Sequence, residues 1–431
     1  MMASIYHQPN ISENPTNCDH LPLTLPPELV GEVLLNLVGE EKSPLPLDFL
    51  ASSMVCQTWN LEACHVVRDK NKWFISTFPP EGYSSADFQR FAKLIVESKR
   101  IGLNFHISIE EMLVGISYIA DGEEYLRIVE AFRSILELQP PRLFYLEIHL
   151  ASISLPLPSF VDHPRTLLDK IEPYCGAINS LALVDDETRS TPLAPVADFV
   201  TSLSSHLDEI LLGPIKLDAQ MHTALAQCTA LKETYFDNMP SHDLPSVLPL
   251  WPELRRFAFE QSRSDQCDMS ATITTLARSC PRLTAFEYEG HEATTPAVSN
   301  EALCFLVESC PELREFKMQE NKAMDDTVLA SLLDHAHALE ELELYRCGNI
   351  TGQEALVGER AGWWPNLQRL SLFGCEELSP AFVEKVVEMC PRLRSVYVLY
   401  FSRDNPEELV ETFSRKGFVL TNNTTWEWEK S

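Results

Sequence analysis

Residues of the types that carry out chemistry are present in this chain, but few of them have the spacing of a reactive site. His335 and His337 stand two residues apart, which does not place two metal ligands on one face of a helix. The pairs Asp185-Asp186 and Asp325-Asp326 are typical of solvated turns. The sequence has no glycine-rich phosphate loop, no His-Glu-x-x-His motif and no serine nucleophile elbow. We therefore expect no catalytic residue, no metal ligand and no cofactor, and we expect that the chain is not an enzyme.

The twelve cysteines lack the spacing of a disulfide framework or a zinc site, because no Cys-x-x-Cys pair occurs. Most stand at equivalent places in a repeated phrase: Cys280, Cys310 and Cys390 at the ends of predicted helices, and Cys347 and Cys375 after predicted strands. We expect them to be buried, reduced thiols that pack as small apolar side chains. Together with an N-terminus that does not resemble a secretory signal, this favours a cytoplasmic location, a nuclear location or both.

A short phrase that recurs through the second half predicts the elements that must position these residues. Its clearest copies begin at Cys280-Pro281-Arg282-Leu283 and at Cys310-Pro311-Glu312-Leu313. The anchor residues of the copies are Leu143, Ile178, Leu207, Leu231, Leu254, Leu283, Leu313, Leu339, Leu367 and Leu393. Successive anchors lie between 23 residues (Leu231 to Leu254) and 35 residues (Leu143 to Ile178) apart. Self-similarity of this period indicates stacked supersecondary units.

Each unit of the repeat predicts one strand and one helix. Apolar residues at the anchor, three residues further on and five residues further on are typical of a short strand with alternate side chains inward. An amphipathic stretch such as Thr327–Leu333 predicts a helix, which ends before the next Cys-Pro pair. One unit cannot bury both its strand face and its helix face, so neighbouring units are expected to stack into a solenoid.

Two copies of the repeat extend further than the others, from Leu339 to Thr351 and from Leu367 to Ser379. They resemble the cysteine-containing leucine-rich repeat. Cys347 and Cys375 stand in the family's cysteine slot, and Asn321 stands in the same slot of an earlier copy. The resemblance implies an α/β fold in which short parallel strands form a concave face and helices form the convex face.

The segment at residues 21–75 contains three motifs: Leu25-Pro26-x-Glu28-Leu29, Val55-Cys56-x-x-Trp59 and a closing Trp73. In order and spacing they resemble the F-box, a three-helix module, although the connection at residues 39–46 is longer. The resemblance implies docking on the small Skp-type adaptor of a cullin-based ubiquitin ligase. The residues assigned to adaptor binding are Leu25, Pro26, Leu29, Val33, Leu37, Val55, Cys56 and Trp59. The alternative is that these helices only cap the open end of the solenoid.

These observations predict five parts in the chain. They are a disordered lead-in at residues 1–20, the F-box-like helical segment at 21–75, a helical connection at 76–100, the leucine-rich repeat solenoid at 101–401 and a C-terminal cap at 402–431. Within the cap, a helix is expected to stop at Gly417, and Trp426 and Trp428 are expected to shield the last repeat.

The outward positions of the repeat strands predict a binding surface for a protein substrate. Residues two, four and six after each anchor point away from the core, because strand side chains alternate. The candidate substrate-binding residues are Glu233, Tyr235, Glu260, Glu287, Glu289, Glu315, Lys317, Glu343, Tyr345 and Phe373. An acidic groove of this kind favours a basic segment and argues against nucleic acid. Two other interpretations remain: any exposed row looks acidic in a chain of formal charge −29, or binding occurs on the junction loops at residues 346–362.

The F-box followed by leucine-rich repeats implies a function in protein degradation. We expect a substrate-recognition adaptor of a cullin-based ubiquitin ligase, with a Skp-type adaptor, a cullin complex and a protein substrate as partners. The mechanism would be proximity, which raises the effective concentration of substrate lysines near a ubiquitin-conjugating enzyme. The alternatives are a leucine-rich repeat scaffold without a ligase and an acidic regulator of a nucleotide-binding protein. No membrane partner is expected, because no apolar run approaches about 18 residues.

Overall fold

A computed structural model of the chain describes its central and C-terminal parts most fully. The described residues are 168–184, 194–239, 244–261, 268–290, 298–357, 363–399, 407–422 and 427–430, except 177, 214 and 216, preceded by three strands and scattered helical residues between 30 and 149. The chain divides into two compact units. The first comprises residues 1–115 and 119–143, and the second comprises residues 116–118 and 144–431. The boundaries predicted at residues 75 and 100 therefore both fall inside the first unit.

In the first unit, the described strands are β1 (Trp73–Ser76) and β2 (Ile109–Gly115), which pair in parallel. Trp73, which we expected to close a helical segment, is the first residue of β1. Val30 and Leu34 lie in a helix and are fully buried, as the apolar stripe of that segment predicts.

The second unit is an α/β structure built on a twelve-stranded, mostly parallel sheet. Its parallel strands follow one another in chain order: β3 (Tyr145–His149), β4 (Ser180–Val184), β5 (Glu209–Leu212), β6 (Glu233–Met239), β7 (Arg256–Gln261), β8 (Ala285–Glu289), β9 (Glu315–Gln319), β10 (Glu341–Tyr345), β11 (Arg369–Phe373) and β12 (Ser395–Leu399). Each strand pairs with the strand of the next repeat in register, for example Leu342 with Leu370. A parallel neighbour needs a crossover connection, and the helical half of each repeat supplies it.

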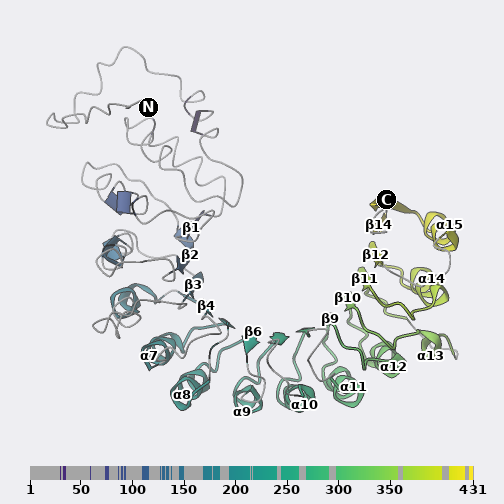
Figure 1. The fold of residues 1–431 in the computed structure, drawn as a ribbon, viewed down its shortest axis with the longest axis horizontal. Coiled ribbons are helices and arrows are strands. Elements are labelled where there is room, and N and C mark those ends of the chain that lie inside the picture. The colour runs from purple at the N-terminus through teal and green to yellow at the C-terminus, as the bar shows by residue number, and fades with distance from the viewer. Residues whose placement is uncertain are drawn as a thin grey trace, which may run out of the picture. The chain divides into compact units, whose positions relative to one another are not determined.

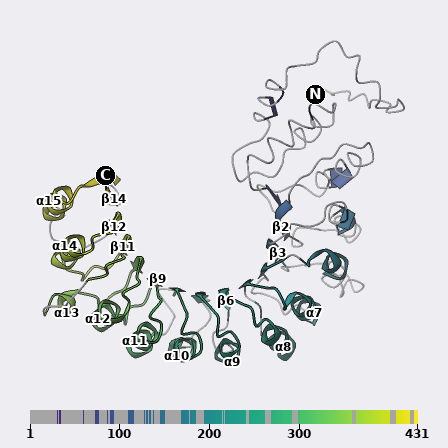
Figure 2. The same cartoon turned by 180° about the vertical axis from the view of Figure 1, so that it is seen from behind.

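The helices follow the strands one by one. They are α7 (Ala194–Leu203), α8 (Ala219–Gln227), α9 (Leu244–Val247), α10 (Ser270–Ser279), α11 (Asn300–Ser309), α12 (Asp326–His335), α13 (Gln353–Leu356) and α14 (Pro380–Met389), with short 3-10 turns at Glu172–Tyr174 and Leu248–Leu250. Within this unit the helices lie on the outer side of the curved sheet and the strands line its inner side (Figure 1 and Figure 2). The arrangement is solenoid-like, as the repeat predicted.

The core lies between the sheet and the helices and is filled by columns of equivalent residues. Leu313, Phe316 and Met318 stand at the anchor, third and fifth positions of one copy, and all are fully buried. Phe286 lies with its ring centroid 5.6 Å from that of Phe316 and 6.3 Å from that of Phe257, so one column is a continuous aromatic stack. Such stacks couple neighbouring repeats directly, because each ring contacts the ring of the next repeat.

The position three residues before the anchor holds cysteine in several repeats. Cys228, Cys280, Cys310 and Cys390 occupy it after helices of nine or ten residues, and all are buried. The described cysteines are free thiols, and all except the partly exposed Cys304 are buried, so the prediction for them is confirmed. Burial raises the pKa of the Cys310 thiol to about 12, which keeps it protonated and unreactive.

Tryptophan replaces cysteine at this position in two repeats whose helices are short. Trp251 follows α9 and the 3-10 turn at Leu248–Leu250, Trp364 stands after α13, and each of these two α-helices has only four residues. The Trp251 indole Nε1 donates to the Leu225 carbonyl of α8 (3.2 Å), and the Trp364 indole Nε1 donates to the Leu332 carbonyl of α12 (3.0 Å). Each indole therefore packs against the helix of the preceding repeat and adds a second donor to a carbonyl that already accepts a backbone N–H.

The C-terminal end of the sheet is closed by an antiparallel hairpin. Helix α15 (Glu407–Arg415) is followed by Gly417, whose φ is 82°, and then by β13 (Phe418–Asn422) and β14 (Glu427–Lys430). Strand β14 pairs antiparallel with both β12 and β13. Trp428 is 3% exposed and stacks on Phe413, so this tryptophan shields the last repeat as expected. Among the described residues, no helix is long and apolar enough to cross a membrane.

Candidate protein-binding face of the sheet

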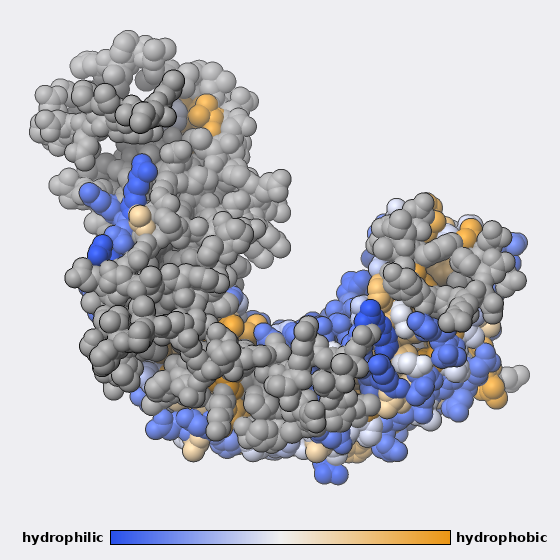
Figure 3. Space-filling view, in the orientation of Figure 1, coloured by the Kyte–Doolittle hydropathy of each residue, from blue (hydrophilic) through white to orange (hydrophobic). Residues whose placement is uncertain are grey.

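The outward side chains of β6 to β12 form three rows across the sheet, which together we call the inner face. The first row is Glu233, Arg256, Ala285, Glu315, Glu341, Arg369 and Ser395. The second row is Tyr235, Ala258, Glu287, Lys317, Glu343, Ser371 and Tyr397. The third row is Glu260, Glu289, Gln319, Tyr345 and Phe373, preceded on β6 by Asp237. All ten candidate substrate-binding residues lie on this face, and Figure 3 shows hydrophilic side chains gathered along the inner side of the curve.

Arg256 pairs with two carboxylates of the first row, Glu233 and Glu315. Its Nη2 donates to Glu315 Oε2 at 2.9 Å, although β8 lies between their two strands. The reach is possible because Ala285, the β8 residue in the same row, has only a methyl side chain. The Arg256 Nε also lies 3.6 Å from Glu233 Oε2. Two of the predicted substrate-binding carboxylates, Glu233 and Glu315, are therefore already paired within the protein.

Glu341 holds a second internal charge cluster. Lys317 Nζ lies 3.1 Å from Glu341 Oε1, and Arg369 Nε donates to Glu341 Oε2 at 3.0 Å. Burial alone would raise the pKa of Glu341, but hydrogen bonds from Arg369 and Lys317 outweigh it and hold the pKa below its ordinary value. Burial would lower the pKa of Lys317, but Glu341 outweighs that effect and raises it.

Three carboxylates of the inner face have no such partner. Glu287, Glu289 and Glu343 are half-buried, and none of them makes a hydrogen bond or an ion pair within the described part of the chain. Burial and the neighbouring Glu287 and Asp237 raise the pKa of Glu289. Burial also raises the pKa of Glu343, and Lys317 offsets only part of that rise. The negative charge of the face is therefore concentrated on β8 and β10, on either side of β9.

The opposite pKa shifts of Glu343 and Glu341 predict opposite effects on stability. A carboxyl whose pKa is raised on folding costs stability when it ionises, and the cost disappears as the pH falls below the folded pKa. Glu343→Gln is therefore expected to increase the free energy of unfolding near neutral pH by up to about 1 kcal/mol. Glu341→Gln is expected to decrease it by a similar amount, because the stability given by a lowered pKa is present above the ordinary value and lost as the pH falls. Urea unfolding near pH 7 and near pH 4 measures both, and a destabilising Glu343→Gln would contradict the assignment.

Aromatic rings continue the inner face toward the C-terminal repeats. Tyr345 stacks on Phe373 with ring centroids 4.4 Å apart, and Phe373 stacks on Tyr397 at 6.3 Å. The Arg346 guanidinium lies 5.3 Å from the centroid of the Tyr345 ring and donates to Glu320 Oε1 at 3.1 Å. We call Tyr345, Phe373 and Tyr397 the aromatic ladder. On the other side, the Tyr235 hydroxyl donates to Glu260 Oε2 at 3.3 Å, and burial together with Glu260 raises the pKa of Tyr235.

Sequence reasoning missed three charged residues of this face, Glu320, Arg346 and Arg369. Glu320 follows β9 with a φ of 59°, and Arg346 follows β10 with a φ of 50°. At these positive φ values the alternation of the strand ends, and both side chains point to the inner face. The only signal in the sequence is Gly374, which stands in the same slot after β11 with φ of 66°. A Cβ at Gly374 would lie 2.7 Å from Arg346 Cγ, so this glycine leaves room for the arginine.

The predicted adaptor-binding residues are only partly described. Leu25, Pro26, Leu29, Leu37, Val55 and Cys56 lie outside the described residues. Val33 lies in a helix and is 40% exposed, unlike its fully buried neighbours Val30 and Leu34. Trp59 is half-buried. Val33 is thus an exposed apolar residue on a helix whose other described apolar side chains are inside.

Among the described residues, the other chemistry-bearing side chains show no reactive arrangement, and Asp185 and Asp186 lie outside the described residues. His335 and His337 are both exposed. Asp326 is only 6% exposed, so the expectation of a solvated turn is wrong for it; its carboxylate accepts hydrogen bonds from the next repeat. No group of three or more His, Cys, Asp or Glu side chains suited to a metal ion occurs among the residues that the structure describes.

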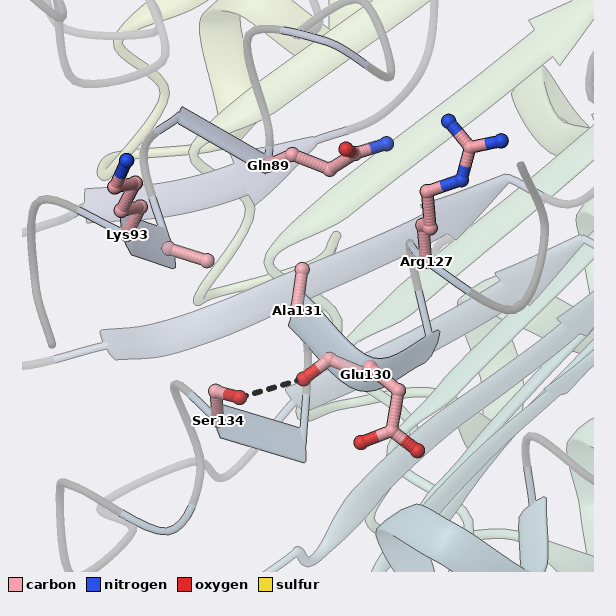
Figure 4. Close-up of a pocket in the computed structure, with 7 residues that line it drawn as sticks. Gln89, Lys93, Arg127, Glu130, Ala131 and Ser134 are labelled. Atoms are coloured by element: carbon pink, nitrogen blue, oxygen red, sulfur yellow. Dashed lines mark hydrogen bonds between the residues drawn. The ribbon is translucent and has the colours of Figure 1, made fainter. Parts of the chain in front are cut away.

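A shallow pocket of 430 Å³ lies in the first unit (Figure 4). Its lining includes the cationic Lys93 and Arg127 and the acidic Glu130. The Ser134 hydroxyl donates to the Glu130 carbonyl at 2.7 Å, and Arg133 Nε lies 2.8 Å from Glu130 Oε2. The described lining residues include no nucleophile in contact with a base, so the pocket shows no catalytic arrangement.

Comparisons with known proteins give little guidance. No family model matches the chain, and no curated protein matches it. Among solved structures, a D-allulose 3-epimerase from Methylomonas sp. shows 12% identity and a TM-score of 0.22 over 49% of this chain and 81% of that chain. A mutant O-GlcNAc hydrolase from Thermobaculum terrenum shows 10% identity and a TM-score of 0.18 over 62% of this chain and 64% of that chain. At such TM-scores neither similarity supports a statement about fold or activity.

The expectation that the chain is not an enzyme is nevertheless corrected. Both of these structures are enzymes by their titles, and the exclusion made from the sequence does not stand. The physical reason is that a motif search detects only residues close together in the sequence, whereas catalytic groups can converge from distant segments. The comparisons assign no reaction in its place.

Proposed function

We propose that the chain is a substrate-recognition adaptor of a cullin-based ubiquitin ligase. In this proposal the segment at residues 21–75 is an F-box that docks on a Skp-type adaptor, and the second unit is a leucine-rich repeat solenoid that binds a protein substrate. The location would be the cytoplasm, the nucleus or both. The observation that carries the proposal is the inner face, a continuous run of parallel strands that presents charged and aromatic side chains while the helices cover the opposite side (Figure 1). A face of this extent suits a protein segment better than a small molecule.

Two features support the assignment of the N-terminal segment. The motif Leu25-Pro26-x-Glu28-Leu29 with Val55-Cys56-x-x-Trp59 resembles the F-box in order and spacing. Val33, which belongs to the proposed docking surface, is 40% exposed. Exposed apolar side chains on a helix are typical of an interaction surface.

The second candidate is a leucine-rich repeat scaffold whose N-terminal helices have no adaptor partner. The complete burial of Val30 and Leu34 favours it, because these side chains already have an internal place to pack. Co-purification separates the two candidates, since only the first requires capture of a Skp-type adaptor.

We expect the tagged full-length chain to retain a purified Skp-type adaptor, and the double variant Leu25→Ala/Pro26→Ala to lose this capture. The loss is expected because a few central apolar contacts dominate such interfaces. Val419→Ala is the matched control, because Val419 is also exposed (56%) but lies on β13 in the C-terminal hairpin. Circular dichroism should be unchanged in both variants. Failure of the unmodified chain to retain the adaptor would contradict the ligase proposal and leave the scaffold.

A further inference from the structure

We propose that the inner face binds an extended basic segment of a partner protein, and that its cationic side chains pair with Glu287, Glu289 and Glu343. This deepens the proposed function, because it names the chemical class of the substrate segment that the repeat domain would hold. The proposal depends on which charges of the face are already paired and which are not.

The cations of the inner face are all engaged by other carboxylates. Arg256 pairs with Glu315, Arg346 pairs with Glu320, and both Lys317 and Arg369 pair with Glu341. In the part of the sheet that the structure describes, no cation therefore forms an ion pair with Glu287, Glu289 or Glu343. A partner that brings positive charge would complete the face, whereas an acidic partner or a phosphate backbone would be repelled.

The register of the strands places the three carboxylates around one spot. Glu287 and Glu343 lie on either side of Lys317 in the second row, and Glu289 and Tyr345 lie on either side of Gln319 in the third row. Strands β8 and β10 are two inter-strand spacings apart, about 10 Å. A lysine or arginine side chain that enters above Gln319 therefore has carboxylates on both sides within the reach of an ion pair.

Lys317 neutralises this spot only in part, because its ammonium is directed to Glu341 in another row, although Glu287 and Glu343 also help to raise the pKa of Lys317. Its Nζ lies 3.1 Å from Glu341 in the first row, and its side chain is only 21% exposed. Burial and then the neighbouring carboxylates raise the pKa of both Glu289 and Glu343, which agrees with incompletely compensated negative charge at this position. Charged groups that cost stability in the free protein are common where a ligand later pairs with them.

The aromatic ladder extends the same surface beyond the carboxylates. Tyr345, Phe373 and Tyr397 are half-buried and stack side by side from β10 to β12. Their edges offer apolar contact to the residues that flank a basic side chain, and aromatic groups are favoured in such interfaces. An extended segment that crosses the strands would meet the carboxylates first and the ladder next.

The test uses the full-length chain and a fluorescein-labelled peptide of about twelve residues with alternating glycine and arginine, an extended chain long enough to cross several strands. Fluorescence anisotropy is measured at about 50 mM and about 150 mM NaCl, because screening weakens ion pairs as salt increases. The triple variant Glu287→Gln/Glu289→Gln/Glu343→Gln is expected to bind the peptide about tenfold more weakly at low salt. Its affinity should also depend less steeply on salt. A peptide of alternating glycine and glutamine should not bind.

The matched control is the triple variant Glu308→Gln/Glu312→Gln/Glu411→Gln. These glutamates are exposed, and they lie on α11, in the turn that follows it and on α15, so the control changes the net charge by the same amount. It is expected to change the affinity less than about twofold. Equal weakening by both triple variants would show attraction by net charge alone and would overturn the proposal. An unchanged affinity of the inner-face triple variant would also overturn the proposal.

Gln319→Glu provides a test that does not depend on loss of binding. It adds a carboxylate between Glu289 and Tyr345, and about threefold tighter peptide binding is expected. Weaker or unchanged binding would count against the proposed spot. Capture of the Skp-type adaptor by residues 21–75 is measured separately. Peptide binding without adaptor capture would overturn only the ligase proposal. Adaptor capture without peptide binding would overturn only this inference.

Discussion

Replacement of Trp364 by alanine is expected to lower the free energy of unfolding by about 3–5 kcal/mol, because it removes a fully buried indole. The loss should exceed that of an ordinary core residue in this chain for two reasons. The indole is among the largest fully buried side chains of the described residues, so its removal leaves a large cavity. The Leu332 carbonyl of α12 also loses its indole donor and keeps only the Ala336 N–H.

Hydrogen-exchange mass spectrometry should show where the damage lies. Each repeat contacts mainly its neighbours, so amides of α12 and β11 should exchange faster while those of α8 and β6 should not change. Trp364→Phe keeps most of the ring but removes the donor, and it is expected to cost about 1–3 kcal/mol. Cys390→Ala, at the equivalent position after a ten-residue helix, should cost less than Trp364→Ala. A uniform increase of exchange across the second unit would contradict a local role of Trp364.

The repeat units could be predicted from the sequence because their periodic signal is strong. The anchor, third and fifth positions of each copy set a period of two in the strand, and Leu313, Phe316 and Met318 are buried as that period requires. The Cys-Pro pairs also marked the helix ends, as Cys280 and Cys310 show. Helix length was not predicted, although Gly358 and Gly362, two weak helix formers, follow α13 and α12 contains no glycine.

The candidate binding face could be predicted as a set of residues but not as a distribution of charge. Strand alternation placed Glu233, Glu287, Glu315 and Glu343 on one face, and the structure agrees. It could not show that Arg256 reaches across β8, because that contact depends on the methyl side chain of Ala285 in another repeat. Pairing between repeats is a property of register, which the sequence of one repeat does not contain.

Asp326 makes another contact between repeats that the sequence of one repeat does not reveal. Its replacement by alanine is expected to lower the free energy of unfolding by about 2–4 kcal/mol. Its Oδ1 accepts from the backbone N–H groups of Thr351 and Gly352, both at 2.7 Å. Its Oδ2 accepts from the Thr351 hydroxyl at 2.6 Å and from the Glu354 N–H at 3.1 Å. A single carboxylate of α12 thus caps the start of α13 in the next repeat, where Gly352 has no side chain to do so. Removal would take the acceptor from the buried Gly352 N–H and from three part-buried donors.

The pH dependence distinguishes this role from simple packing. Burial would raise the pKa of Asp326, but the hydrogen bonds from Thr351, Gly352 and Glu354 outweigh it and lower the pKa below the usual value of 3.8. A lowered pKa gives stability that is present above the ordinary value and is lost as the pH falls through the folded value. The difference in unfolding free energy between the unmodified chain and Asp326→Asn should therefore be largest near pH 7 and shrink below about pH 4. Asp325→Ala is the matched control: its carboxylate caps only its own helix through Thr327, so its loss should cost about 1 kcal/mol. An Asp326→Asn effect that stays constant from pH 7 to below pH 4 would show that the ionised carboxylate does not join the two repeats.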